Sequence, residues 1–285
     1  MILGYNTNGL AHHDPVEGLR LLHGLGYGAV GLTLDHGLLN PLADDFPRQL
    51  DTWGALLDGL NLTPVIETGA RFLLDPHEKH EPTLVSPTTQ QRARRIDFLM
   101  RTIEAAERLE AEAVSLWSGV CRDGAGRDEA MDRLVEGLRP VLADAGERSV
   151  ALAFEPEPGM LIATLAEYIE LKQRLTDAGC DTRALCLTLD IGHLHCNGET
   201  PIADHIRSFA DEIANVHIED MRAGIHEHLM FGDGEIDFPP IIAALAEIGY
   251  DGPLCVELSR HSHMAPQAAR AAFEFLEPLV SASNR

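Results

Sequence analysis

Short apolar runs alternate with longer segments of helical periodicity along the whole chain, with polar turns between them. Runs that are apolar on successive residues predict strands covered on both faces, as parallel strands are. The predicted strands lie at residues 2–5, 29–34, 63–66, 113–117, 150–154, 185–189, 215–218 and 254–256. The predicted helices lie at residues 15–25, 47–60, 89–109, 128–145, 165–178, 202–212, 238–248 and 266–279.

Several of these helices carry start and stop signals. A capping side chain before a proline predicts a helix start at Asp14-Pro15 and at Thr200-Pro201. A glycine where the chain must turn left-handed predicts helix ends at Gly26, Gly146, Gly179 and Gly249. The sequence therefore predicts eight repeats of a strand followed by a helix.

The repeat predicts the architecture of the chain. Eight such units in 285 residues, with no linker rich in Pro, Gly or Ser between halves, favour an α/β fold that is a single (β/α)8 TIM barrel. We expect one domain over residues 1–285. Because barrel enzymes place their chemistry at the carboxyl ends of the strands, the polar residues that close each strand become the candidates for a site.

Composition and charge narrow the class of protein. The chain has 22 Lys and Arg against 45 Asp and Glu, a formal net charge of −23, which argues against nucleic acid as a partner. Five cysteines without a CxxC pair suit a reducing compartment. The first residues do not show the basic segment followed by an apolar segment that is typical of a signal peptide. No apolar run approaches the ~20 residues of a membrane span. We expect a cytoplasmic protein with no membrane partner.

Four polar side chains, one on each of the last four predicted strands, predict a metal site. Glu155, Asp190 and Glu257 end their strands, and His217 lies within its strand. Three carboxylates meeting one imidazole would repel one another strongly without a cation. This oxygen-rich set suits one divalent ion, which could be Mn, Mg, Co or Zn. A single carboxylate at a strand end is more often a helix cap, so the prediction rests on the four together.

A second group of histidines follows the seventh strand. His226 and His228 flank Glu227, and residues two apart in an extended loop project to the same side. His193, from the end of the sixth strand, could join them around a second metal ion. Such a pair also arises in solvated loops, so this ion is left open.

These segments together resemble the xylose isomerase-like TIM barrel superfamily, which comprises sugar and sugar phosphate isomerases and epimerases and related hydroxypyruvate isomerases, ketose 3-epimerases and apurinic endonucleases. The motifs that carry the resemblance are FEPEPG, LDIGHLH, VHIEDMR, FGDGEIDF and DGPLCVELS, and the match covers most of the chain. The resemblance implies that Glu155, Asp190, His217 and Glu257 bind a catalytic divalent metal. It implies further that His193 and Arg222 contact substrate oxygens.

The segment HEHLMFGDGE also resembles the endonuclease loop that carries ligands of an additional zinc, with His193, His226 and His228 at the matching positions. Elsewhere the chain departs from the endonucleases. Glu67 and Trp117 close the third and fourth strands where that branch has histidine ligands. We assign both, with Glu157 of FEPEPG, to the substrate-binding surface, although core packing is an equal interpretation for Trp117.

The function implied is a metal-dependent isomerase or epimerase of a sugar, sugar phosphate or related α-hydroxy carbonyl compound. Glu155 and Glu257 would be its catalytic acid–base pair, transferring protons through a metal-stabilised enediolate. One alternative is a di-metal hydrolase of a phosphoester or related bond. Another alternative is a noncatalytic sugar-binding barrel. Family resemblance also makes a homodimer an expectation. The sequence does not separate isomerase from epimerase or identify the substrate.

Overall fold

The computed structural model describes residues 1–283 and confirms the predicted barrel. Eight parallel strands close in the order β1-β10-β7-β6-β5-β4-β3-β2. Their bounds are Ile2–Asn6 (β1), Ala29–Thr33 (β2), Thr63–Glu67 (β3), Val114–Leu116 (β4), Leu152–Phe154 (β5), Leu185–Asp190 (β6), Ile213–Ile218 (β7) and Pro253–Val256 (β10). Each overlaps the strand predicted for it, because successive apolar residues mark strands buried on both faces.

The predicted helices are also present. They are Pro15–Leu25 (α1), Phe46–Leu60 (α2), Thr89–Arg108 (α3), Arg127–Arg148 (α4), Leu165–Asp177 (α5), Ile202–Ser208 (α7), Phe238–Glu247 (α8) and Ala265–Ser283 (α9). The sequence analysis missed a short helix, Ile191–Asn197 (α6), and a two-stranded hairpin, Asp220–Arg222 (β8) with Ile225–Leu229 (β9). Two 3-10 turns, Thr7–Leu10 (η1) and Ser262–Met264 (η2), follow β1 and β10. These additional elements all lie in loops after strands.

The predicted helix boundaries hold in part. Asp14 accepts a hydrogen bond from the backbone N–H of Glu17, and Gly26 is left-handed, as predicted for α1. The Thr200 cap is wrong, because Pro201 is the N-cap of α7 and no side chain caps that helix. The end at Gly146 is also wrong. Helix α4 continues to Arg148 and ends at Ser149, with φ +56°, because only a position beyond the last helical turn needs a left-handed residue.

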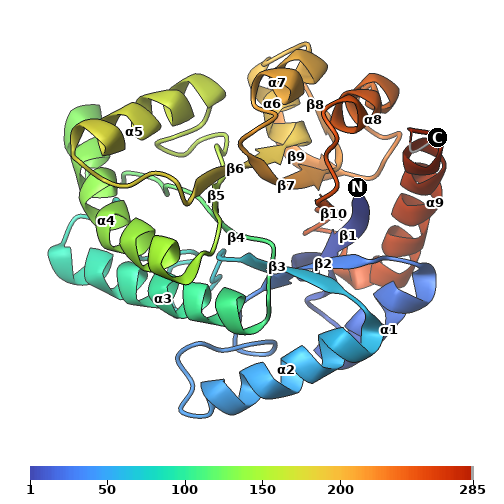
Figure 1. The fold of residues 1–285 in the computed structure, drawn as a ribbon, viewed down its shortest axis with the longest axis horizontal. Coiled ribbons are helices and arrows are strands. Elements are labelled where there is room, and N and C mark those ends of the chain that lie inside the picture. The colour runs from blue at the N-terminus through green and yellow to red at the C-terminus, as the bar shows by residue number, and fades with distance from the viewer. Residues whose placement is uncertain (284–285) are drawn as a thin grey trace. The chain divides into compact units, whose positions relative to one another are not determined.

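The described residues group into two compact units. The first comprises residues 1–32, 55–65 and 188–283, in which α8 packs against α7 and α9. The second comprises residues 33–54 and 66–187, in which α3 and α4 run side by side (Figure 1). The expectation of one domain over residues 1–285 stays a prediction.

Strand register in the first unit decides which side chains share a face. His217 of β7 and Gly4 of β1 are both register partners of Cys255 in β10. Side chains two residues apart in a strand project to the same side. Asn6, Asn215 and Glu257 therefore project to the same face of the sheet as His217.

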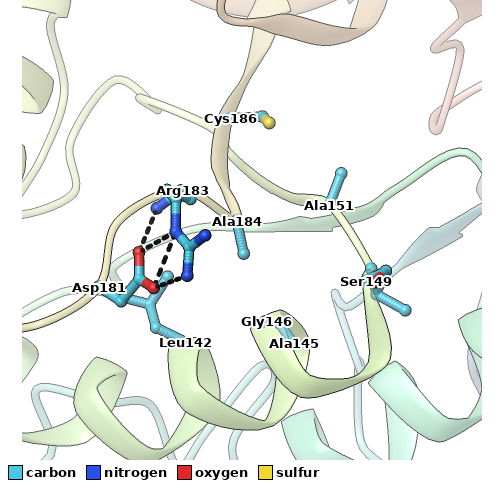
Figure 2. A pocket seen from close by; sticks show the side chains of 10 residues that line it. Leu142, Ala145, Gly146, Ser149, Ala151, Asp181, Arg183, Ala184 and Cys186 are labelled. Carbon is cyan, nitrogen blue, oxygen red and sulfur yellow. Dashed lines mark hydrogen bonds and ion pairs between the residues drawn. The ribbon is translucent and has the colours of Figure 1, made fainter.

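A hollow of about 310 Å³ lies in the second unit at the amino-terminal ends of β5 and β6. Figure 2 shows Asp181 and Arg183 paired at its edge, with Ala151 and Ala184 beside it. Because it lies at the end of these strands opposite Glu155 and Asp190, it contributes nothing to the predicted site. Among residues 1–283, no helix is both long and apolar enough to cross a membrane.

Candidate metal centre and active site

Asp190 ends β6 and begins α6, and its two carboxylate oxygens have different surroundings. Oδ1 accepts a hydrogen bond from the backbone N–H of His193 at 2.7 Å and so caps α6. Oδ2 is buried and has no hydrogen-bond donor among residues 1–283. It lies 3.7 Å from Nε2 of His193 and 3.8 Å from Nδ1 of His217. The helix cap and the candidate cation ligand are thus different oxygens of the same residue.

His217 and Glu257 meet directly. Nδ1 of His217 lies 3.1 Å from Oε2 of Glu257, and Oε1 of Glu257 accepts a hydrogen bond from the Asn8 amide at 2.8 Å. The His217 ring is 1 % exposed. Oxygens of Asp190 and Glu257 therefore face the same nitrogen, as ligands of one ion would.

Electrostatics in this group favour charged carboxylates. Burial alone would raise the pKa of Glu257, but the hydrogen bond from His217 and the neighbouring imidazoles outweigh burial and bring the pKa below its usual range. Burial likewise opposes ionisation of Asp190, but His193 and His217 lower its pKa. Ionised carboxylates are the protonation states that a divalent cation requires of these two residues.

Glu155 follows β5 in the second unit. Its carboxylate is buried, 5 % exposed, and its backbone N–H donates to the carbonyl of Leu116 at 2.8 Å, which continues the β4–β5 ladder by one residue. It thus closes its strand, as predicted. Glu67 closes β3 and is also buried. Glu157 is half-buried, and its backbone pairs with Ile162 rather than with a neighbouring strand.

Trp117 follows β4 and packs between two basic side chains. The Arg95 guanidinium carbon lies 4.7 Å from the indole centroid, and the His80 ring meets the indole edge-on at 5.6 Å. Arg95 is fully buried, and burial lowers its pKa to about 9. Both contacts favour the core-packing interpretation for part of the indole surface, and a role in substrate binding stays a prediction.

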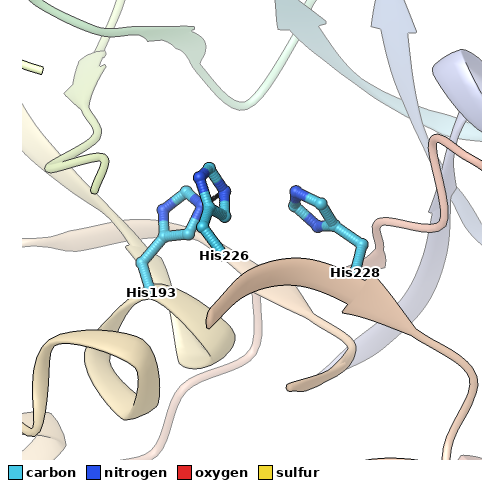
Figure 3. Close-up of side chains that lie close together, drawn as sticks. All are labelled: His193, His226 and His228. Carbon is cyan, nitrogen blue, oxygen red and sulfur yellow. Dashed lines mark hydrogen bonds between the residues drawn. The ribbon is translucent and has the colours of Figure 1, made fainter. Parts of the chain in front are cut away.

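The three histidines of the second predicted group come together in the first unit. His193 lies on α6, and His226 and His228 lie two apart on β9, which is extended as expected. One ring nitrogen from each lies within 4.8 Å of the other two, and the Nε2 atoms of His193 and His226 are 3.0 Å apart. Figure 3 shows the rings of His193 and His226 against each other, with His228 beside them. This arrangement could hold a metal ion.

A residue that the sequence analysis missed lies behind this cluster. Glu219 is fully buried, and neither carboxylate oxygen has a hydrogen-bond partner among residues 1–283. Its Oε1 lies 3.9 Å from Nδ1 of His228. Burial raises the pKa of Glu219 well above its usual value, with Asp190 adding to the effect. Burial alone would lower the pKa of His228, but Glu219 and Glu257 outweigh burial and raise the pKa to about 10.

The loop that carries these histidines is fixed by Asp220, another residue that the sequence analysis did not single out. Its carboxylate accepts hydrogen bonds from the backbone N–H groups of Met221, Gly232, Gly234 and Ile236, at 2.8–3.1 Å. Arg222 is exposed and donates to the carbonyl of Asp233 at 3.0 Å. Contact of Arg222 with substrate oxygens stays a prediction.

The fold and this arrangement define a barrel with a candidate metal centre at the strand ends. The profile of the xylose isomerase-like TIM barrel family matches residues 19–279. The chain belongs to that family, which confirms the resemblance.

Two relatives by sequence cover most of the chain. L-ribulose-5-phosphate 3-epimerase UlaE of Shigella flexneri serotype 5b is 23% identical over 256 residues, covering 89% of this chain and 85% of UlaE. The uncharacterized protein MJ1311 of Methanocaldococcus jannaschii is 24% identical over 254 residues, covering 81% of this chain and 82% of MJ1311.

Solved structures share the fold. An L-ribulose 3-epimerase superposes with a TM-score of 0.75 at 21% identity, covering 100% of this chain and 96% of that one. The IolI protein with a bound zinc atom superposes with a TM-score of 0.74 at 18% identity, covering 99% of both chains. At these identities the likeness shows the fold alone.

Proposed function

We propose that the protein is a metal-dependent sugar isomerase or epimerase whose divalent ion is held by Glu155, Asp190, His217 and Glu257. The observation that carries the proposal is the buried Oδ2 of Asp190, which lacks a donor in the described chain and faces the ring nitrogen that Glu257 also approaches. Asp190, His217 and Glu257 of the first unit each offer one ligand atom, and Glu155 is the fourth expected ligand. Three carboxylates and one neutral imidazole fit Mn²⁺, Mg²⁺, Co²⁺ or Zn²⁺.

The reaction must remove a weakly acidic proton from carbon. A bound divalent ion would supply Lewis-acid polarisation of the substrate carbonyl. In epimerisation, the ionised carboxylate of one glutamate, Glu155 or Glu257, takes the proton from one face of the carbon. The other glutamate, protonated, returns a proton to the opposite face. In aldose–ketose isomerisation the proton moves between adjacent carbons on one face.

The remaining residues orient the substrate. The low pKa of Glu257 keeps that group ionised at neutral pH, as a ligand of a divalent ion must be. We assign His193 and Arg222 to substrate oxygens, and Glu67, Glu157 and Trp117 to the surrounding surface. The names of the relatives favour ketopentoses and their 5-phosphates as the first substrates to test.

Solvent-deuterium exchange tests the proposal. The protein would be incubated in D2O with Mn²⁺ or Zn²⁺ and a panel of L-ribulose, L-ribulose 5-phosphate, D-allulose and hydroxypyruvate. Epimerisation at C3 of a ketose labels C3, whereas aldose–ketose isomerisation labels C1. We expect carbon-bound deuterium that disappears after chelation and returns with metal. No label on any substrate, with one metal bound per chain, would contradict the proposal.

The cluster of His193, His226 and His228 supports a second candidate function. A second ion there would make the centre dinuclear, and a metal-dependent hydrolase of a phosphoester would use its bound water as the nucleophile. Buried Glu219 lies behind His228, and its carboxyl group would stabilise a cation bound at this cluster better than an anion. Metal counting separates the functions: one oxygen-ligated ion favours proton transfer, and two or three zinc ions favour hydrolysis.

A further inference from the structure

Two buried asparagines flank one nitrogen of His217. The amide nitrogen of Asn6, at the end of β1, lies 3.2 Å from Nε2, and that of Asn215, on β7, lies 3.1 Å from the same atom. All three side chains are at most 1 % exposed. On the opposite side of the ring, Nδ1 faces Glu257 and Asp190, where the proposed ion would bind. The ring is thus held between an amide pair and a carboxylate pair.

This arrangement fits only one tautomer of His217. Two amide N–H groups donate to Nε2, so that atom carries a lone pair and the ring proton is on Nδ1, which donates to Oε2 of Glu257. A ring protonated at Nδ1 cannot bind a metal through that atom.

The amide oxygens indicate how the ring changes state. Oδ1 of Asn6 and Oδ1 of Asn215 are both buried and have no hydrogen-bond partner among residues 1–283. A buried polar atom without a partner is unfavourable, because it has lost its hydrogen bonds to water. A half-turn of an amide group exchanges its oxygen and nitrogen, so each asparagine can offer Nε2 either a donor or an acceptor. The pair can therefore support both tautomers of the neutral ring.

We propose that Asn6 and Asn215 are positioning residues that set the tautomer of His217, and that both turn their amide oxygens toward Nε2 when Nδ1 binds a divalent ion. The ring stays neutral throughout. One proton leaves Nδ1 to solvent and one from solvent is gained at Nε2, where the amide oxygens then accept its hydrogen bond. The inference rests on the proposed metal site and extends it to these two residues.

Histidine-selective ¹⁵N NMR tests the inference directly. Two-bond ¹H–¹⁵N correlations distinguish the two tautomers, and the spectrum of a His217→Gln variant assigns the His217 ring. In metal-free protein we expect the proton on Nδ1, and with one equivalent of Zn²⁺ we expect it on Nε2. The same tautomer in both states would overturn the proposal.

Paired substitutions test the two asparagines. Asn6→Leu and Asn215→Leu keep the size but remove both polar groups, and each is expected to weaken Zn²⁺ binding about 10–100-fold. Asn6→Asp and Asn215→Asp offer only acceptor oxygens, so they should protect binding and protonate Nε2 even in metal-free protein. Asn61→Asp is the control, since Asn61 is exposed and gains the same charge away from the site. Loss of binding in the Asp variants equal to that in the Leu variants would overturn the proposal.

The two proposals fail separately. If wild-type protein binds no divalent ion, the proposed function fails. The metal-free tautomer and its change in the Asp variants still decide the role of the asparagines. Thermal unfolding identifies any Leu variant that does not fold, and in that case the wild-type and Asp spectra decide.

Discussion

The Glu219 carboxylate lies 3.9 Å from Nδ1 of His228, with both residues buried and no hydrogen-bond partner for either group in the described part of the chain. A carboxylate behind a metal-binding imidazole fixes the ring and makes its other nitrogen a better ligand. In this chain it leaves Nε2 of His228 as the atom free to bind an ion beside His193 and His226. Glu219 thus links a buried carboxyl group to the three-histidine cluster, and a bound cation would favour its ionised form.

We expect Glu219→Gln to weaken the second metal site and spare the first. Gln cannot supply the carboxylate that a bound cation would favour, so affinity for the second Zn²⁺ should fall about 10–100-fold. Competition titration with a zinc chelator, with metal content measured by mass spectrometry, would reveal the change. Glu227→Gln is the matched control, because Glu227 lies between the two histidines in sequence but pairs with Arg260 at the surface. Equal zinc affinity in Glu219→Gln and wild type would contradict this role.

Removing either catalytic carboxylate should stop turnover. Glu155→Gln and Glu257→Gln keep the size of the side chain but cannot accept a proton, and loss of a general acid or base costs about 100–10,000-fold in rate. We expect both variants to keep the far-ultraviolet circular dichroism of wild type and most of the bound metal. Glu247→Gln, which removes only a surface pair with Arg207, should keep full activity. Substantial turnover in both site variants would reject the proposed mechanism.

Strands and strand ends were predictable because local patterns specify them. Residues such as Val114 to Leu116 are apolar or small in succession, which indicates a strand covered on both faces, and Asp190 is the first charged residue after such a run. The parallel barrel then brings residues at equivalent ends together, as for His217 and Glu257. Sequence order and strand pattern were enough to predict that these two residues lie close together.

Glu219 and Asp220 were not predictable in this way, because their roles depend on burial by distant segments. The Glu-Asp pair after the predicted strand reads as the start of a polar turn, and nothing local distinguishes a buried carboxylate from a solvated one. Gly192 is a retrospective signal: a Cβ there would overlap Oε1 of Glu219, so this position in DIGHLH must stay small. Likewise, Asn6 becomes informative only once β1, β10 and β7 are aligned.

Asp220 should control the order of the loop between β9 and α8. Replacing it with Ala would leave the backbone N–H groups of Gly232, Gly234 and Ile236 without their acceptor, which we expect to cost about 2–4 kcal/mol of unfolding free energy. Urea unfolding would measure the loss, and limited proteolysis should show new cleavage at residues 230–236. Asp237→Ala is the control, since Asp237 makes no side-chain cap bond to α8. Equal stability of the two variants would contradict the role of Asp220.

His80 should make the protein less stable in mild acid. Burial lowers the pKa of His80 from 6.5 to about 4, with its bond to the Gly69 carbonyl opposing the shift only in part. Between these pH values the unfolded chain binds a proton that the folded chain does not. The free energy of unfolding should therefore fall as pH decreases from about 6.5 to 4, by about 3 kcal/mol from this residue.

The contribution of His80 can be isolated by difference. His80→Gln keeps a side-chain donor for the Gly69 carbonyl but has no proton to gain, so its unfolding free energy should change less between pH 7 and pH 4 than that of wild type. Urea unfolding of both metal-free proteins across this range would measure the difference, because the other buried histidines contribute equally to each curve. The two proteins should have equal slopes above pH 7, where His80 is neutral in both the folded and the unfolded chain. Parallel curves down to pH 4 would mean that His80 is protonated in the folded chain, contrary to its buried contact with Trp117.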